Sequence, residues 1–385
     1  MGIVRPGWRI GVLAAATVAA TLTPATGAAA AIVAPTPDHT VGFDGMVLAS
    51  TYVGSTVYLG GEFQNAIVAG RKVPRSHLAA VDARTGALLP WAPSVNTTVR
   101  AMTAAGSWLY IAGGFKTVGG QARPGLSNVD LRTGVVGPLH HTLLGIGYAL
   151  ANGAGRLYLG GRLTRVDGRP VRNLAAFSLA SGAIDTRFRA TTDGKVEALA
   201  TGGSRLYVAG RFQSLDGAAR AAHLGAVRAS DGRLDTTFHA SVPYWASSIA
   251  LGPGMVYAGL GGPGGRTIAY RMDGRPLWTA TTDGDVQALA YLDRVVYVGG
   301  HFDRACSRPV VAVTSWCLAS VQSRGKLAAL DAATGRLMPW NPRAHGVYGV
   351  TTMSADRLLR KLAAGGQFST VGGVAHPYFV QFSVR

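Results

Sequence analysis

Short apolar segments with alternating polar positions recur along almost the whole chain, and an aromatic residue marks the centre of most of them. The pattern is an apolar residue, Tyr, a second apolar residue and then Gly, as in VYLGGEF and VYVGGHF. Alternation with a period of two and enrichment in Val, Leu and Tyr predict strands rather than helices. The repeats are centred near Tyr58, Tyr110, Tyr158, Tyr207, Tyr257, Tyr297 and Ala363.

Each repeat predicts four antiparallel strands joined by tight turns. A first strand such as residues 99–102 (VRAM) precedes the VYxGG strand, and a variable loop leads to a third strand such as residues 78–82 (LAAVD). A Thr-Gly, Ser-Gly or Asp-Gly turn then leads to a fourth strand, as in ALLPW. Gly in these turns supplies the positive φ that tight hairpins need. Four strands per unit of about 50 residues predict an all-β fold, a seven-bladed β-propeller.

One strand is missing from the last repeat, and one extra strand precedes the first. The final repeat reaches its third strand at residues 379–383, whereas residues 32–41 form an extended segment with no repeat of their own. We therefore expect this N-terminal strand to complete the last blade, so that residues 32–385 form a single β-propeller domain.

Residues 1–31 have the pattern of a secretory signal peptide. Arg5 and Arg9 precede a short apolar stretch, and the run of alanines at residues 28–31 suits a cleavage site. A membrane anchor is the alternative, but the apolar stretch is short for a span. Without a lipobox or a sorting tail, the sequence predicts a freely released, extracellular protein with no membrane span after signal removal.

Cys306 and Cys317 are the only two cysteines. In an exported chain we expect them to form one local disulfide, and two free thiols are the alternative. The insert from residue 303 to 326 that carries them is longer than the matching loop of the other repeats, and we expect it to rise over the channel face.

Composition excludes a disordered chain, because charged residues are 15% of the sequence, against about 25% in typical proteins, and hydrophobic residues are 48%. The net charge is +18, which favours anionic partners such as cell-wall polymers, acidic polysaccharide or extracellular nucleic acid. However, the positive residues are scattered, and no basic cluster is interleaved with aromatic residues. We therefore predict no specific nucleic-acid site and interpret the charge mainly as a contribution to solubility.

Residues 229–238 (ASDGRLDTTF) and 180–188 (ASGAIDTRF), preceded by GRFQSLDG and GRLTRVDG, resemble delta-60 repeats, which belong to exported bacterial β-propellers. The Gly-Gly doublet and the downstream Trp91 and Trp340 are also similar to kelch repeats. These resemblances imply a propeller and export, and bring no catalytic residues with them. The segments ending at Trp91 and Trp340 look like the tryptophan-docking motif of quinoproteins, but their Asp-to-Trp spacing is one residue too long. We expect no quinone or other cofactor.

Recognisable catalytic machinery is missing from the sequence. Most Asp residues fall in repeat turns, where they cap backbone groups. There is no nucleophile elbow, zinc-protease, P-loop or EF-hand motif. The adjacent His140 and His141 would point to opposite faces of a strand, so we predict neither a metal site nor catalytic residues.

Propeller geometry places the variable position of GGxF and several inter-blade loops close to the mouth of the central channel. Polar residues at these positions are candidates for ligand binding: Glu62, Arg162, Arg211, His301, Gln367, Asp193, Asp283 and His345. Tyr244 and Trp245 lie in the same loops.

The sequence therefore predicts a binding or scaffolding module at the cell surface, with a ligand that it does not identify. Its partner would be an anionic cell-wall polymer, a polysaccharide or another surface protein. The alternative is an extracellular carbohydrate-active enzyme with its site on the channel face. That alternative requires at least two of Glu62, Asp193, Asp283, His301 and His345 to converge in one pocket.

Overall fold

The computed structural model describes residues 1–2, 32–310, 312 and 317–384, and these residues are almost entirely strands and turns. Among them the only helix is the short η1 (Ala219–Ala221), and no helix could span a membrane. The predicted signal peptide lies outside the described residues apart from residues 1 and 2.

The predicted strand pattern is confirmed along the chain. Each repeat begins with a long strand, and we name each unit by that first strand: β2 (Val47–Val53), β7 (Val99–Ala105), β12 (His141–Gly153), β16 (Lys195–Gly202), β19 (Ala246–Gly252), β23 (Val286–Leu292) and β29 (Gly349–Asp356). The VYxGG segments form the second strands: β3 (Thr56–Gly61), β8 (Trp108–Gly113), β13 (Arg156–Val166), β17 (Arg205–Arg211), β20 (Met255–Leu260), β24 (Val295–Gly300) and β30 (Lys361–Gln367). The third strands are β6 (Leu78–Asp82), β11 (Gly125–Asp130), β15 (Leu174–Ser178), β18 (Leu224–Arg228), β21 (Gly265–Arg271), β27 (Leu327–Asp331) and β33 (Phe379–Ser383). Within each unit the three pair antiparallel in this order.

The fourth strand is shorter than the sequence predicted. Only the β19 unit has a full one, β22 (Pro276–Thr282). In the β2, β7, β12, β16 and β23 units it is reduced to a single β-bridge, such as that between Val81 and Leu88. Pro90 follows this bridge closely in the β2 unit, and proline cannot donate a hydrogen bond to a neighbouring strand.

Loops carry the remaining short strands of the described residues; two of these strands precede a first strand, and the others lie between a second and a third strand. These are β1 (Gly42–Phe43), β4 (Asn65–Val68), β5 (Arg71–Pro74), β9 (Thr117–Val118), β10 (Gln121–Ala122), β14 (Arg169–Pro170), β25 (Arg304–Cys306), β26 (Val321–Ser323), β28 (Ala344–His345), β31 (Thr370–Val371) and β32 (Val374–Ala375). The Gly119-Gly120 and Gly372-Gly373 doublets form hairpin turns in two of these loops, and all four residues have positive φ.

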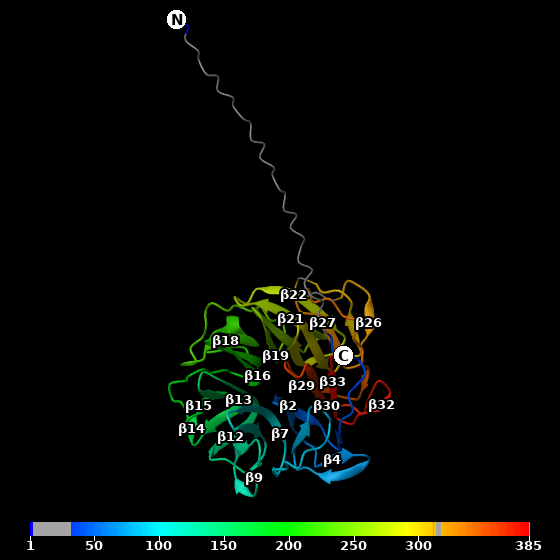
Figure 1. Ribbon diagram of the computed structural model, residues 1–385. Coiled ribbons are helices and arrows are strands. Elements are labelled where there is room, and N and C mark those ends of the chain that lie inside the picture. The colour runs from blue at the N-terminus through cyan, green and yellow to red at the C-terminus, as the bar shows by residue number, and fades with distance from the viewer. Residues whose placement is uncertain (3–31, 311, 313–316, 385) are drawn as a thin grey trace.

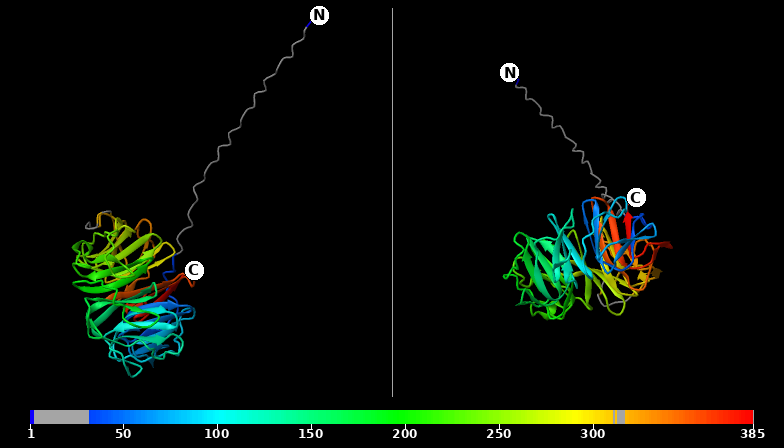
Figure 2. Two further views of the ribbon diagram at one scale, coloured as in Figure 1. Left: turned by 90° about the vertical axis from the view of Figure 1, so that its left-hand side faces the viewer. Right: turned by 90° about the horizontal axis from the view of Figure 1, so that it is seen from below.

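The units are arranged around a central axis, with the first strands innermost. Neighbouring first strands contact each other in the order β2, β7, β12, β16, β19, β23 and β29, and β29 also contacts β2. Figure 1 shows β2, β7, β16, β19 and β29 near the middle and the short outer strands at the periphery. The two further views in Figure 2 show the same sheets from other directions.

Adjacent units approach closely at the first Gly of each Gly-Gly doublet. A Cβ added to Gly299 of the β23 unit would lie 2.5 Å from Cγ1 of Val350, which lies in the first strand of the next unit. The second residue, Gly300, lies against the backbone carbonyl of Asp285 in its own unit. The doublet is therefore required by space, because either added methyl group would collide with a neighbouring strand.

The same contact recurs with compensating residues. Where the first strand has Val at this contact, the residue that faces it in the neighbouring unit is Gly. Where the doublet begins with Ala, the residue that faces it is Gly or Ala. The pairs are Gly60–Val99, Ala112–Gly147, Gly160–Val196, Ala209–Ala246, Gly259–Val286, Gly299–Val350 and Gly365–Val47. The last pair joins the C-terminal unit to the first one.

Replacing Gly299 with Ala should overpack this contact and lower the free energy of unfolding by about 1–3 kcal/mol. Adding Val350→Ala should recover part of that loss, since the chain already tolerates Ala209 opposite Ala246. Urea unfolding of the single and double variants measures the coupling. Gly114→Ala is the matched control, because nothing lies within 4 Å of its added Cβ. Strictly additive losses in the double variant would contradict the contact.

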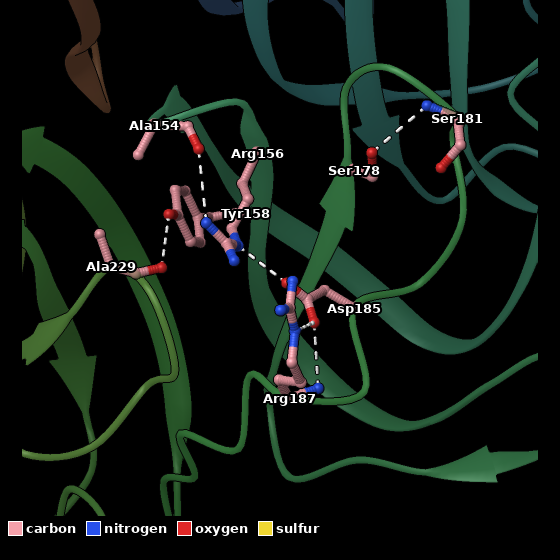
Figure 3. A network of polar contacts seen from close by, with 8 residues as sticks. All are labelled: Ala154, Arg156, Tyr158, Ser178, Ser181, Asp185, Arg187 and Ala229. Carbon is pink, nitrogen blue, oxygen red and sulfur yellow. Dashed lines mark hydrogen bonds and ion pairs between the residues drawn. The ribbon is translucent and has the colours of Figure 1, made fainter.

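Aromatic residues tie several units to the next one. The hydroxyl of Tyr158 donates to the carbonyl of Ala229 in the following unit, at 2.7 Å, as Figure 3 shows. In the same view Arg156 Nε donates to Asp185 Oδ2 at 2.8 Å. The ring of Tyr158 also contacts Phe188, and Tyr58, Tyr207, Tyr257 and Tyr297 contact an aromatic ring at the matching position: Trp91, Phe238, Trp278 and Trp340.

The N-terminal segment lies beside the last strand, as the sequence predicted. Val33 forms an antiparallel bridge with Val384, and the N–H of Ala34 donates to Ser383 O at 2.8 Å. The β23 unit binds this segment with its own aromatic pair: Val33 N–H donates to Tyr297 Oη at 2.9 Å, and Trp340 Nε1 donates to Ala34 O at 3.2 Å. Tyr297 and Trp340 thus bind residues 33 and 34 in the way that the matching aromatic residues of other units bind the end of the third strand in the following unit.

A buried ion pair fixes the same segment. Asp38 Oδ2 accepts hydrogen bonds from Lys361 Nζ at 2.8 Å and Ser383 Oγ at 2.6 Å, and the two charged side chains are 18% and 10% exposed. Both partners belong to the β29 unit. The ion pair joins two segments that lie 323 residues apart in the sequence.

Replacing Asp38 with Ala should destabilise the protein by about 1–3 kcal/mol, because Lys361 loses its carboxylate at a largely buried site. Urea unfolding measures the change. Arg357→Gln, which removes an exposed ion pair with Asp293, is the control and should cost about 0.5 kcal/mol or less. A loss for Asp38→Ala no larger than this control would show that the Asp38–Lys361 ion pair contributes no more to stability than an exposed pair does.

The cysteine insert departs from its expected position. The predicted disulfide is present between Cys306 and Cys317. However, β25 pairs with β22 at Ala305 and Thr282, so the insert extends the sheet of the β19 unit outward. The free backbone edge of β22, the one complete fourth strand, provides the hydrogen bonds that draw the insert there.

Candidate ligand site at the channel mouth

A β-bulge occurs at the same position of every first strand. In β2, for example, Val47 and Ala49 pair with Gly61 and Gly60, and Leu48 between them has no partner in β3. The bulge residues are Leu48, Arg100, Tyr148, Glu197, Ser247, Gln287 and Thr351. A bulge leaves one residue unpaired and redirects its side chain. Here all the bulge side chains line one pocket.

The pocket lies at one end of the space enclosed by the first strands, which we call the central channel. Three successive residues of every first strand line the channel, which has a volume of about 240 Å³. The adjoining mouth pocket has a volume of about 370 Å³, and its lining comprises the bulge residues with Met46, Lys195, Arg211, Asp285 and Tyr348. Strands from the whole ring therefore contribute to this one site.

Charged side chains pair across the mouth pocket. Glu197 accepts from Arg211 Nε at 2.9 Å and lies 3.0 Å from Lys195 Nζ, and its side chain is 12% exposed. Arg100 lies 3.6 Å from Glu62. The positive groups are thereby held in fixed positions rather than extended into solvent.

Aromatic rings contact the same cations. Lys195 Nζ lies 3.9 Å from the ring centroid of Tyr148, and Arg211 lies 4.4 Å from that of Trp245. Cation–π contacts of this kind stabilise the charge and orient the side chain. Planar guanidinium, amide and aromatic groups around one pocket are suited to binding a polar ligand of defined shape.

Several buried polar atoms at this site have no hydrogen-bond partner among the described residues. They are Arg100 Nε, Trp245 Nε1, Ser248 Oγ and Gln287 Oε1. Ser248 and Gln287 line the channel, and Trp245 lies under Arg211. Buried polar groups are nearly always satisfied, so these donors and acceptors can bind a ligand or water in the channel.

The structure places only Arg211, among the residues selected from the sequence, in the lining of the mouth pocket. Glu62 contacts Arg100, and Gln367 Oε1 accepts from the N–H of Tyr348 at 3.1 Å. Both residues therefore contact a lining residue of the mouth pocket without lining the pocket themselves. Arg162, His301 and His345 are exposed, and their side chains make no hydrogen bond or ion pair with any described residue.

Asp193 and Asp283 bind backbone groups of their own units. Asp193 Oδ1 accepts from the N–H groups of Gln213 and Ser214, and Asp283 Oδ1 accepts from those of Asp303 and Arg304. Asp44 and Asn96 do the same, and all four residues lie four positions before a bulge residue. Burial raises the pKa of Asp193, but the hydrogen bonds from Ser214 and Gln213 outweigh it and the pKa is lowered.

Replacing Asp193 with Ala should destabilise the protein by about 1 kcal/mol through loss of these bonds. Asp193→Asn should be nearly neutral at pH 7, because Asn96 occupies the equivalent position. Since the folded carboxyl has a lowered pKa, its contribution is present above the unfolded value of about 3.9 and decreases as the pH falls below it. The unmodified protein should therefore lose stability relative to the Asp193→Asn variant below about pH 4, as thermal unfolding would measure. Equal losses for the Ala and Asn variants at pH 7 would contradict this capping role.

The bulge residues themselves were not selected from the sequence, although a signal for them exists. Each of the first six lies ten positions before the central Tyr of its repeat, and the last lies twelve before Ala363. The five residues that the catalytic alternative required line neither the mouth pocket nor the channel, as far as the described residues form them. Within the described part of the chain, no three His, Cys, Asp or Glu side chains are grouped so that they could hold a metal ion.

Comparison with known proteins identifies the fold. No family model matches this sequence, and no curated protein matches it. Among solved structures, the chain is similar to the RRP9 WD40 repeats, with a TM-score of 0.59 and 13% identity over 91% of this chain and 99% of that one. It is also similar to the WD40 beta propeller domain of Doa1, with a TM-score of 0.57 and 10% identity over 91% and 96% of the two chains. These likenesses establish a β-propeller, and at such low identity they establish the fold alone.

Proposed function

We propose that this protein is an exported, seven-bladed β-propeller that binds a ligand at its channel mouth and acts as a binding or scaffolding module at the cell surface. The mouth pocket carries the proposal, because every first strand contributes a side chain to it, and its lining residues Arg100 and Gln287 hold buried polar atoms that have no protein partner among the described residues. A pocket with convergent polar groups and aromatic rings is typical of a ligand site.

The proposed blade count rests on the unbroken contacts between successive first strands, including β29 with β2. In this arrangement residues 32–385 form a single domain, and the N-terminal segment completes the blade of β29, where Ala34 and Asp38 donate backbone hydrogen bonds to β33. The resemblance of residues 180–188 and 229–238 to delta-60 and kelch repeats supports the same assignment.

The pattern of residues 1–31 supports export to the cell exterior. The Cys306–Cys317 disulfide agrees with an oxidising compartment, because such bonds persist mainly outside the cytosol. Binding is favoured over carbohydrate hydrolysis because Asp193 and Asp283, two of the acidic candidates, bind backbone N–H groups instead of facing the mouth pocket.

A panel of glycans and cell-wall polymers, screened at about 0.05 M and 0.5 M salt, tests the proposal. The double variant Arg211→Gln/Gln287→Leu should lower the affinity for the bound member of the panel by at least about tenfold, because it removes two polar contacts. Binding by the unmodified protein should persist at the higher salt concentration.

Arg162→Gln is the matched control. Arg162 and Arg211 occupy equivalent positions after the central Tyr of their repeats, and replacing either one with Gln removes one positive charge. However, only Arg211 lines the mouth pocket. Equal weakening by the two changes, or binding that disappears with salt in the unmodified protein, would show that the channel mouth is not a specific site. Thermal unfolding verifies that each variant is folded.

A further inference from the structure

A second pocket lies at the periphery of the β12 unit, away from the channel. It has a volume of about 490 Å³ and lies between β15 and the chain that leads to the next unit. Apolar residues line it, among them Pro170, Val171 and Ile184, and Arg169, Arg172 and Arg189 also line it. We call it the arginine groove. It shares no lining residue with the mouth pocket.

The arginines of the groove differ from those of the channel mouth in having no partner among the described residues. Arg169, Arg172 and Arg189 are exposed, and their guanidinium groups make no hydrogen bond or ion pair with the residues that the structure describes. By contrast, Arg211 at the mouth is paired with Glu197 and contacts Trp245. The groove therefore presents guanidinium groups that can bind an anion without breaking an existing contact.

The only carboxylate in the described lining of the groove is already paired. Asp185 is bound by Arg156 Nε at 2.8 Å and by Arg187 Nε at 3.4 Å, and it accepts a further bond from the N–H of Arg187. Its charge is thus neutralised by arginines outside the lining. The groove as a whole has a net positive charge, and apolar residues line it together with the guanidinium groups.

We propose that the arginine groove binds a carboxylate-bearing polysaccharide, a chain of uronic acid residues. Guanidinium groups bind carboxylates with two parallel hydrogen bonds, and a pyranose ring presents an apolar C–H face that can pack against the apolar lining residues. A glycerol phosphate chain has no such face. Single-stranded nucleic acid is bound largely by stacking its bases on exposed aromatic rings, whereas Phe188, the only aromatic residue of the described lining, is 8% exposed.

A galacturonate hexasaccharide is the probe, with affinity measured by calorimetry on residues 32–385 at about 0.15 M salt. The triple variant Arg169→Gln/Arg172→Gln/Arg189→Gln should bind it at least about tenfold more weakly, as expected for the loss of charge-assisted hydrogen bonds. The methyl-esterified hexasaccharide has the same rings without the charge. Its affinity for the unmodified protein should therefore be lower than that of the acidic hexasaccharide by a similar factor.

The control triple, Arg84→Gln/Arg132→Gln/Arg336→Gln, removes the same charge from exposed hairpin turns and should change the affinity less than twofold. The mouth variant Arg211→Gln/Gln287→Leu should leave hexasaccharide binding unchanged, which separates this site from the one proposed above. If the groove triple does not fold, the single variants of Arg169 and Arg189, whose side chains are solvent-exposed, replace it.

Several results would overturn the proposal. They are no binding of the hexasaccharide by the unmodified protein, equal losses in the groove and control triples, and equal affinity for the esterified probe. Tighter binding of glycerol phosphate polymer or single-stranded DNA of the same charge would assign the groove to another class of ligand and contradict the proposal in the same way.

Discussion

The separation between neighbouring first strands is the constraint on which the rest of the structure depends. Each sheet packs against two neighbours, so an error in one separation must be absorbed around the whole ring. The chain never places Val opposite a residue larger than Gly, and the two units in which the doublet begins with Ala face Gly147 and Ala246. Because close-packed interiors tolerate little excess volume, this local complementarity sets the geometry of the entire molecule.

The same doublet explains why the channel mouth can vary in chemistry. Its second Gly admits a carbonyl of the first strand at the bulge, and the bulge leaves one side chain without a strand partner. That side chain takes no part in the core. The bulge positions accordingly hold Leu, Arg, Tyr, Glu, Ser, Gln and Thr, no two alike, whereas their neighbours are small or β-branched. Scaffold and site are thus encoded by adjacent residues of one strand.

Sequence reasoning could predict the strands, the disulfide and the position of residues 32–41, because each depends on a pattern that is visible along the chain. It missed the bulge residues, since alternation does not show where a strand contains one extra residue. It grouped Asp193 and Asp283 with the channel mouth because only two other repeats have a capping residue at this position, and one of these, Asn96, differs in residue type, which hides the periodicity. The position of the insert was missed because it depends on β22, and no local signal marks that strand as complete.

The two pockets use arginine in physically different ways. At the mouth, Glu197 and Trp245 hold Arg211 in place before any ligand binds. Little side-chain entropy is therefore lost on binding, and the site discriminates between ligands by their shape. In the arginine groove the guanidinium groups are free among the described residues, so binding there gains more from charge and depends more on salt. A protein with a net charge of +18 attracts anionic chains over its whole surface. The apolar residues that line the groove together with Arg172 and Arg189 are what would convert that general attraction into a preference for a sugar ring.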